Sequence, residues 1–143
     1  MKIVVTLCFV SVGLFFQTEL DAQNWSQVSK VIANDRAQED LFGFYVSLDG
    51  NRAVIGAPQE DEDANGGNFL SMAGAAYVFS KDTNGHWLQT QKLVASDRDA
   101  FSFFGEAVAM NGNQLLIGSP REQKDANGNN PITTAGAVYV FER

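Results

Sequence analysis

Residues 41–58 read LFGFYVSLDGNRAVIGAP, and residues 103–120 read FFGEAVAMNGNQLLIGSP. The same step of 62 residues relates the chain on both sides of these stretches, and no gap is needed at any point. About 25 of the 58 pairs between residues 24–81 and 86–143 are identical, which is far above chance. The chain therefore contains one unit written twice.

Each unit is expected to form four short strands. The sequences DGN at residues 49–51 and NGN at residues 111–113 tolerate a positive φ, which predicts a tight hairpin between the second and third strands. The bounds of the other strands follow from apolar–polar alternation and from continuous apolar runs. The predicted strands cover residues 25–33, 44–48, 53–56 and 75–80 in the first unit, and 87–95, 106–110, 115–118 and 137–142 in the second.

The third and fourth strands of each unit are almost continuously apolar. A hairpin with one solvated face would alternate apolar and polar residues, so these strands are expected to be covered on both faces. Four strands per unit and a long fixed period favour blades packed radially in a β-propeller. The predicted fold class is all-β, with two four-stranded antiparallel blades that form a partial propeller. A β-sandwich made of the two units is the alternative.

The first 22 residues have the order of a secretory signal peptide helix: Lys2, an apolar run over residues 3–16, and polar residues before Ala22. The run is shorter than the roughly 18–20 residues that span a bilayer. An uncleaved membrane anchor is the alternative. Cleavage after Ala22 would also remove Cys8, the only cysteine, so the mature chain is expected to have no disulfide and no membrane span.

Composition limits the classes of partner. The chain has 143 residues, with 10 Lys plus Arg against 17 Asp plus Glu, and a formal net charge of −7. Nucleic-acid binders need clustered positive charge to neutralise phosphates, so nucleic acid is not an expected partner. Three parts are predicted along the chain: a signal peptide over residues 1–22, a first repeat over 23–85 and a second over 86–143.

The letters FG at residues 42–43 and GAP at residues 56–58 resemble the motifs that name the FG-GAP repeat family, the blade unit of integrin-α-type β-propellers. The second unit has FG at residues 104–105 and GSP at residues 118–120. The resemblance covers nearly the whole mature chain at one fixed period. It implies a propeller scaffold that exported proteins use for adhesion or ligand recognition, often with calcium in the blades, and it does not imply catalysis.

The chain departs from that family in two ways. Integrin-type blades place an Asp-rich calcium loop between the second and third strands, where this chain has only the turns at residues 49–51 and 111–113. Propellers close with about 4–8 blades, and two repeats make fewer. We therefore also expect that the chain is a fragment or requires further blades or self-association.

The acidic loop after the third strand is a candidate calcium site. Residues 61–66 read DEDANG, the opening half of a calcium-loop pattern, with alternate oxygen ligands and a glycine for the sharp turn. The candidate ligands are Asp61, Asp63 and Asn65. In the second copy Gln123 takes the first ligand position. The alternative is a solvated polar loop whose residues serve turn chemistry.

The other conspicuous residues are interpreted as structural. Trp25 and Trp87 are expected in the core or between blades, together with the aromatic pairs of the last strands. His86 follows a turn and is expected on the surface. A second acidic group is interpreted as a charged loop; its members are Asp35, Glu39 and Asp40, with Asp97 and Asp99 in the copy.

The combined prediction is an exported, non-catalytic repeat protein, secreted or at the cell surface, that binds an extracellular protein or glycan. Residues 58–73 and 120–135 are expected to form the recognition surface, because they lie at one end of every blade. No nucleophile–base pair or phosphate-binding glycine loop is found, so the chain is predicted not to be an enzyme. Two alternatives are an assembly subunit that completes a larger propeller and an accessory region of an exported enzyme.

Overall fold

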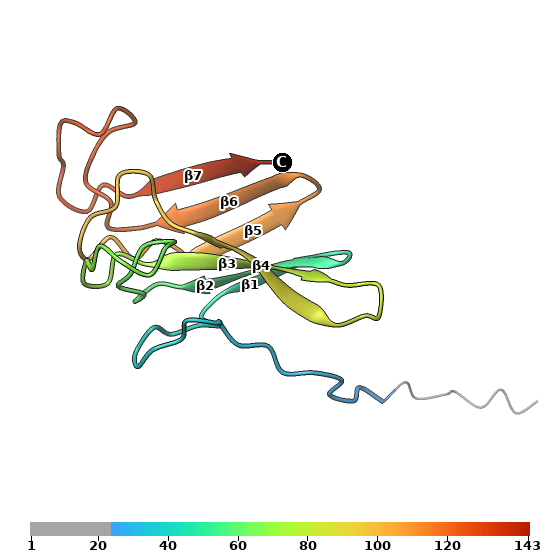
Figure 1. Ribbon diagram of the computed structural model, residues 1–143. Coiled ribbons are helices and arrows are strands. Elements are labelled where there is room, and N and C mark those ends of the chain that lie inside the picture. The colour runs from blue at the N-terminus through green and yellow to red at the C-terminus, as the bar shows by residue number, and fades with distance from the viewer. Residues whose placement is uncertain (1–23) are drawn as a thin grey trace, which may run out of the picture.

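The computed structural model describes residues 24–143, so the predicted signal peptide over 1–22 lies outside the described residues. Figure 1 shows two sheets lying one over the other. Their strand orders are β1-β2-β3-β4 and β5-β6-β7, and all pairings are antiparallel, which confirms the predicted all-β class. Within the described range no helix is long and apolar enough to cross a membrane. The strands are β1 (Val46–Asp49), β2 (Arg52–Ala57), β3 (Ala75–Lys81), β4 (Trp87–Leu93), β5 (Ala107–Asn111), β6 (Gln114–Ser119) and β7 (Ala137–Glu142).

Both predicted hairpins are present. Asp49 pairs with Arg52 across the first turn, and Asn111 pairs with Gln114 across the second. The glycine inside each turn has a positive φ, 56° in the first and 55° in the second. Glycine reaches this conformation without the steric cost that a side chain would add, so these turns can be tight.

Strand β4 belongs to the second repeat in sequence but to the first sheet in space. It pairs along β3, with Leu93 opposite Ala76 and Trp87 opposite Lys81. The short turn at residues 82–85 returns the chain directly along β3, which places β4 in the same sheet. A blade therefore combines the last three strands of one repeat with the first strand of the next, whereas the sequence predicted that the four strands of one repeat form one blade.

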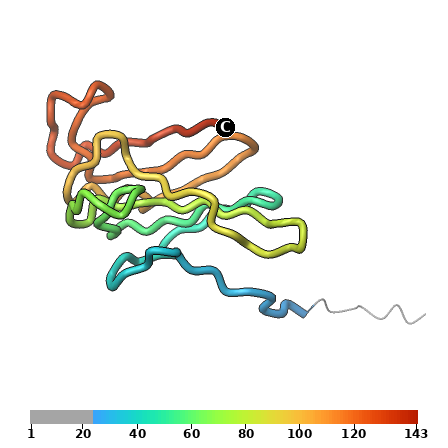
Figure 2. Tube along the Cα trace, in the orientation of Figure 1, coloured from blue at the N-terminus to red at the C-terminus, as the bar shows by residue number. Residues whose placement is uncertain are grey.

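Residues 24–33, the repeat equivalent of β4, form no strand in the described structure. Trp87 packs against the core of the first sheet, whereas Trp25 is fully exposed, at 102%. The expectation that Trp25 lies in the core or between blades is therefore wrong for this chain, because no sheet edge lies beside it. Figure 2 shows residues 24–33, in blue, on the side of the first sheet that faces away from the second.

The two sheets differ in how well they are covered. Most residues of β2 and β3 are buried, as the apolar runs predicted. Strand β7 instead alternates between half-buried and exposed residues, with Val138 at 65% and Val140 at 60% exposure. Coverage on both faces thus holds for the first sheet only, because among residues 24–143 no further sheet packs on the outer face of the second sheet.

The second Phe-Gly motif forms the joint between the sheets. A Cβ atom on Gly105 would lie 2.2 Å from the carbonyl oxygen of Ala75, and one on Gly56 would lie 1.9 Å from the carbonyl oxygen of Gly105. Only glycine permits such a close backbone approach. The fully buried ring of Phe104 fills the adjacent space and packs edge-on against Tyr139, with centroids 5.2 Å apart.

Candidate functional site

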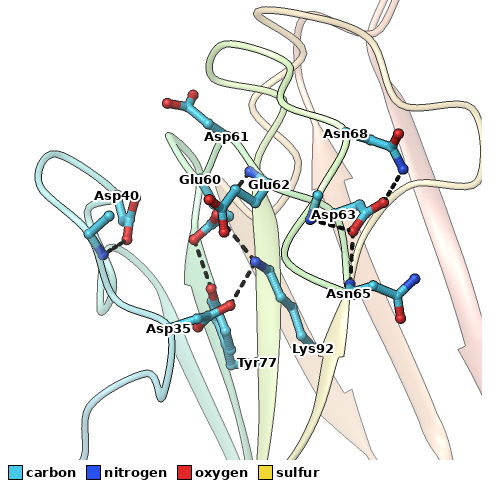
Figure 3. A network of polar contacts seen from close by, with 12 residues as sticks. Asp35, Asp40, Glu60, Asp61, Glu62, Asp63, Asn65, Asn68, Tyr77 and Lys92 are labelled. Carbon is cyan, nitrogen blue, oxygen red and sulfur yellow. Dashed lines mark hydrogen bonds and ion pairs between the residues drawn. The ribbon is translucent and has the colours of Figure 1, made fainter.

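The loop between β2 and β3 folds around the carboxylate of Asp63. One oxygen accepts hydrogen bonds from the backbone N–H groups of Asn65 at 2.8 Å and Gly67 at 3.1 Å. The other accepts one from the side-chain amide of Asn68 (Figure 3). The Asn68 bond first, and then the two backbone bonds, hold the pKa of Asp63 below its ordinary value. Asp63 is therefore the centre of a hydrogen-bonded polar turn.

The loop between β6 and β7 repeats this arrangement. Asp125 accepts bonds from the backbone N–H groups of Asn127 at 2.9 Å and Asn129 at 3.0 Å, and from the side-chain amide of Asn130 at 2.7 Å. The Asn129 bond is the main cause that lowers the pKa of Asp125. The two loops, residues 58–73 and 120–135, are called the rim loops below.

The structure does not bring the three predicted calcium ligands together. Asp61 accepts a bond from the backbone N–H of Met72 at 2.6 Å, and its side chain lies apart from that of Asp63 (Figure 3). Asn65 meets Asp63 through its backbone N–H group. Among residues 24–143 no three His, Cys, Asp or Glu side chains gather to hold a metal ion. The side chains do not fit as one ligand set in this arrangement, and calcium binding stays a prediction for titration.

Arg98, from the second repeat, fixes the first rim loop. Its guanidinium donates to the carbonyl oxygens of Asn68 at 2.8 Å and Asp61 at 2.7 Å. A planar guanidinium with several donors can hold two carbonyl groups at once. The conformation of a rim loop therefore depends on the repeat that follows it.

A buried ionic network lies beside the first rim loop (Figure 3). The Lys92 Nζ atom is 2.8 Å from Asp35 Oδ2 and 3.2 Å from Glu60 Oε1, and the side chains of Lys92 and Glu60 are only 4% and 3% exposed. Tyr77 donates its hydroxyl to Glu60 Oε2 at 2.8 Å, and its ring centroid lies 5.6 Å from the ammonium group. Buried charges need such pairing, because desolvation is costly.

The pKa shifts follow from this packing. Burial alone raises the pKa of Asp35, but the hydrogen bond and charge of Lys92 together outweigh it and bring the pKa below its ordinary value. Burial, and then the Glu60 carboxylate, raise the pKa of Tyr77. Asp40 is 6% exposed and accepts a bond from the Ala37 N–H, and burial raises its pKa. The interpretation of Asp35 and Asp40 as part of a merely charged loop is therefore wrong.

Sequence reasoning missed this network, although the repeat contained a signal for it. A lysine directly before three apolar residues, at the same place in both copies, indicates a partner in the interior. The network residues recur at the offset of 62: Asp35 as Asp97, Glu60 as Glu122, Tyr77 as Tyr139, and Lys92 as the earlier Lys30.

The second sheet contains the acidic half of the network without its lysine. Tyr139 donates to Asp97 Oδ1 at 2.7 Å, and Ser102 donates to Glu122 Oε2 at 3.3 Å. Glu122 is 1% exposed, and within residues 24–143 no cationic side chain lies within 4.0 Å of its carboxylate. Lys124 contacts the carbonyl oxygen of Asp97 instead, at 2.9 Å.

Two other observations concern the surface. His86 lies on the turn after β3 with its side chain 74% exposed, as predicted. The rim loops each carry an exposed apolar side chain, Phe69 and Ile132, and both are 68% exposed. Exposed side chains on a hydrogen-bonded loop are available to contact another molecule.

Comparison with known proteins agrees with this geometry. The family model described as FG-GAP repeat matches residues 25–79 and 87–141, which together make up more than half of the chain. A search of the curated proteins found no match. Gly56 of the first Gly-Ala-Pro motif and Gly105 of the second Phe-Gly motif are among the glycines that let the two sheets approach. The chain belongs to the FG-GAP repeat family.

Proposed function

We propose that this chain is an exported, non-catalytic recognition module, secreted or at the cell surface, whose rim loops bind an extracellular protein or glycan. The observation that supports the proposal is that both rim loops, with the same Asp-centred hydrogen bonds, emerge at the same end of the two sheets (Figure 1). Two matching loops at one end of stacked sheets can contact the same ligand, and repeat scaffolds use such surfaces for recognition.

The rim loops suit binding because their backbones are already held. Asp63 and Asp125 order the turns, and Arg98 fixes the first loop. A loop that is ordered before binding loses less conformational entropy when a ligand arrives. Phe69 and Ile132 then offer apolar contact, and the surrounding amides and carboxylates offer hydrogen bonds to a protein or sugar.

The proposal of a non-catalytic role follows from how the titratable groups are used. Glu60 and Lys92 are enclosed in ion pairs, and Tyr77 has a raised pKa and donates to Glu60. The side chains of Lys92 and Glu60 are only 4% and 3% exposed, which supports a stabilising role for them. The repeats of this family also occur mostly in exported or cell-surface proteins, which supports an extracellular role.

Binding assays with loop variants test the proposal. The labelled protein is applied to a glycan microarray and to a panel of immobilised extracellular-matrix proteins. The double variant Phe69→Ser/Ile132→Ser is expected to lose at least tenfold in affinity for any probe that the wild type binds, with an unchanged circular dichroism spectrum. Thr83→Ala, on an exposed turn away from the rim loops, is the control and keeps full binding. Equal binding by the double variant and the wild type overturns the proposal.

A further inference from the structure

The geometry points to a second copy of this chain as the partner that completes the second sheet. In this assembly residues 25–31 of one copy form the missing strand along the free edge of β7 in the other, as β4 does along β3. The inference goes beyond the proposed recognition function, because it concerns how the blades themselves are completed.

The two edges match by repeat equivalence. Residues 25–31 correspond to residues 87–93, and β7 corresponds to β3. The pairing of Leu93 with Ala76 in the first sheet predicts Val31 opposite Val138 between copies. Both edges are free among residues 24–143, because residues 24–33 form no strand, Trp25 is 102% exposed, and β7 stands last in the order β5-β6-β7. A strand added to an open edge gains main-chain hydrogen bonds and side-chain contacts together.

Charge complementarity supports the same placement. Lys30 is the repeat equivalent of Lys92, so the register places it beside Tyr139. A surface hollow lined by Asp97, Glu122, Lys124 and Tyr139 opens at this edge. Lys124 donates there to the carbonyl oxygen of Asp97 at 2.9 Å, and among residues 24–143 no cationic side chain lies within 4.0 Å of the Asp97 or Glu122 carboxylate. Lys30 would therefore supply the cation that the buried Glu122 lacks.

The glycine joint is also present on both sides of the proposed interface. Gly43 has a φ of 94°, close to the 90° of Gly105, but no atom within 4 Å of its would-be Cβ. In the other copy, the glycines that Gly43 would approach are Gly118 and Gly136, the equivalents of Gly56 and Gly74. The residues before each joint share the same left-handed conformation; Glu39 and Leu41 have φ of 71° and 56°, and Phe101 and Phe103 have 63° and 56°.

The offset of 62 residues predicts two further contacts between copies. Arg36 is the equivalent of Arg98, so it would hold the second rim loop by its carbonyl oxygens as Arg98 holds the first. In the first sheet Lys81 lies over the ring of Trp87, 5.1 Å from its centroid. The corresponding contact between copies would join a C-terminal arginine to an N-terminal tryptophan; the residues are Arg143 and Trp25.

One chain cannot make these contacts with itself in this arrangement. Residues 24–33 and β7 lie on opposite sides of the stack of sheets (Figure 2). The interface is therefore head-to-tail, and such interfaces build rings when the rotation closes. Because each copy contributes two blades and propellers have about 4–8 blades, a closed ring would hold two to four copies.

Light scattering during size-exclusion chromatography tests this inference on the purified protein. The wild type is expected to have the mass of two to four chains. Lys30→Glu reverses the charge on the added strand, and Gly118→Ala places a methyl group where the joint of the second copy would lie. Each variant is expected to have the mass of one chain and an unchanged circular dichroism spectrum. Val28→Thr is the matched control, because its equivalent Thr90 is exposed on β4, and it keeps the wild-type mass.

A mixture of the two variants gives the sharper result. The Lys30→Glu chain keeps a usable β7 edge, and the Gly118→Ala chain keeps a usable N-terminal strand, so together they form one interface and stop at two chains. A wild type with the mass of one chain, or a mixture that stays at one chain, overturns the inference. The Phe69→Ser/Ile132→Ser variant keeps the wild-type mass, so failure of assembly and failure of ligand binding are distinguishable.

Discussion

In the first sheet Lys92 lies between Asp35 and Glu60, whereas in the second sheet no lysine among residues 24–143 pairs with the carboxylates of the equivalent acids Asp97 and Glu122. The first sheet has four strands and the second has three. Both come from the same repeated sequence. The difference shows that the repeat and the blade are offset by one strand, so each blade is finished by the repeat that follows it.

The offset has a physical consequence for stability. A repeat that supplies its first strand to the preceding blade cannot unfold alone without exposing the β3 edge of that blade. Lys92 lies on β4, the strand that the second repeat supplies to the first sheet, and Arg98 and Gly105 follow β4 in the sequence. Substitutions in the first blade therefore measure what these residues contribute to stability, and the equivalent substitutions in the second blade are the control.

The largest difference is expected from the two equivalent lysines. Lys92→Met leaves Glu60 buried without a cation and should lower the free energy of unfolding by about 3 kcal/mol. Lys30→Met changes an exposed side chain and should cost less than about 0.5 kcal/mol in dilute, monomeric protein. Urea denaturation measures both. Equal losses would mean that the Lys92 ion pairs do not stabilise the first sheet.

The next effect concerns the glycine joint. Gly56→Ala would put a methyl group within 1.9 Å of the Gly105 carbonyl oxygen, and we expect a loss of about 2–3 kcal/mol in the free energy of unfolding. In Gly118→Ala the nearest atom is the Ala107 Cβ at 3.1 Å, and the expected loss is below about 1 kcal/mol. Thermal and urea unfolding compare the two variants. A Gly118→Ala variant as unstable as Gly56→Ala would contradict this explanation of the motif.

Removal of the tyrosine hydroxyls should give a smaller difference in the free energy of unfolding between the two networks. Tyr77→Phe removes a donor to the buried Glu60 and should cost about 1–2 kcal/mol. Tyr139→Phe removes a donor to Asp97 at a half-buried site, and the expected cost is below about 1 kcal/mol. Chemical denaturation at neutral pH, where both hydroxyls are protonated, provides the comparison. The opposite order would show that Asp97 depends more on its tyrosine than Glu60 does.

Acid should act on the first network through Asp35. Its pKa is below 3.8 in the folded protein, so its contribution is present above about pH 4 and is lost as the pH falls through the folded-state value. Asp63 and Asp125 act in the same direction, whereas the raised pKa of Asp40 opposes them. Stability measured from pH 5 to pH 2 should therefore fall less steeply in Asp35→Asn than in the wild type. Parallel curves would exclude Asp35 as a contributor.

The smallest expected effect concerns calcium and the difference between the rim loops. If Asp61, Asp63 and Asn65 bind the ion, millimolar calcium raises the melting temperature of the wild type, because a ligand of the folded state stabilises it. Asp61→Gln gives the first loop the residue of the second, Gln123, and should abolish the increase. An unchanged wild-type melting temperature refutes the calcium hypothesis.

Much of the fold could be predicted from local sequence. The tight turns required positive φ at Gly50 and Gly112, and apolar runs marked the central strands. The surface position of His86 followed from its place after a turn. The exposure of Trp25 could not be predicted in this way, because whether a tryptophan is buried depends on a neighbouring sheet edge, and local sequence does not show where that edge lies.

The candidate site was predicted only in part. Residues 58–73 and 120–135 were predicted as a recognition surface because they lie at one end of every blade. The acidic residues of the first loop left two interpretations open, a calcium site and a polar turn, and only the structure shows that Asp63 accepts hydrogen bonds from its own loop. The ionic network was missed because Asp35 and Lys92 are 57 residues apart. Local sequence patterns do not show which charged residues, far apart in the chain, form ion pairs in the folded interior.

By itself the amino-acid sequence determined that the chain is a tandem β repeat, because period, turn chemistry and hydrophobic runs are local properties. Only the tertiary structure decided that β4 joins the preceding sheet and that Gly105 enters between Gly56 and Ala75. It also decided that the buried Glu122 carboxylate has no cationic side chain within 4.0 Å among residues 24–143. These outcomes depend on strand pairing and backbone approach between residues far apart in the chain, and such contacts form only when the sheets pack.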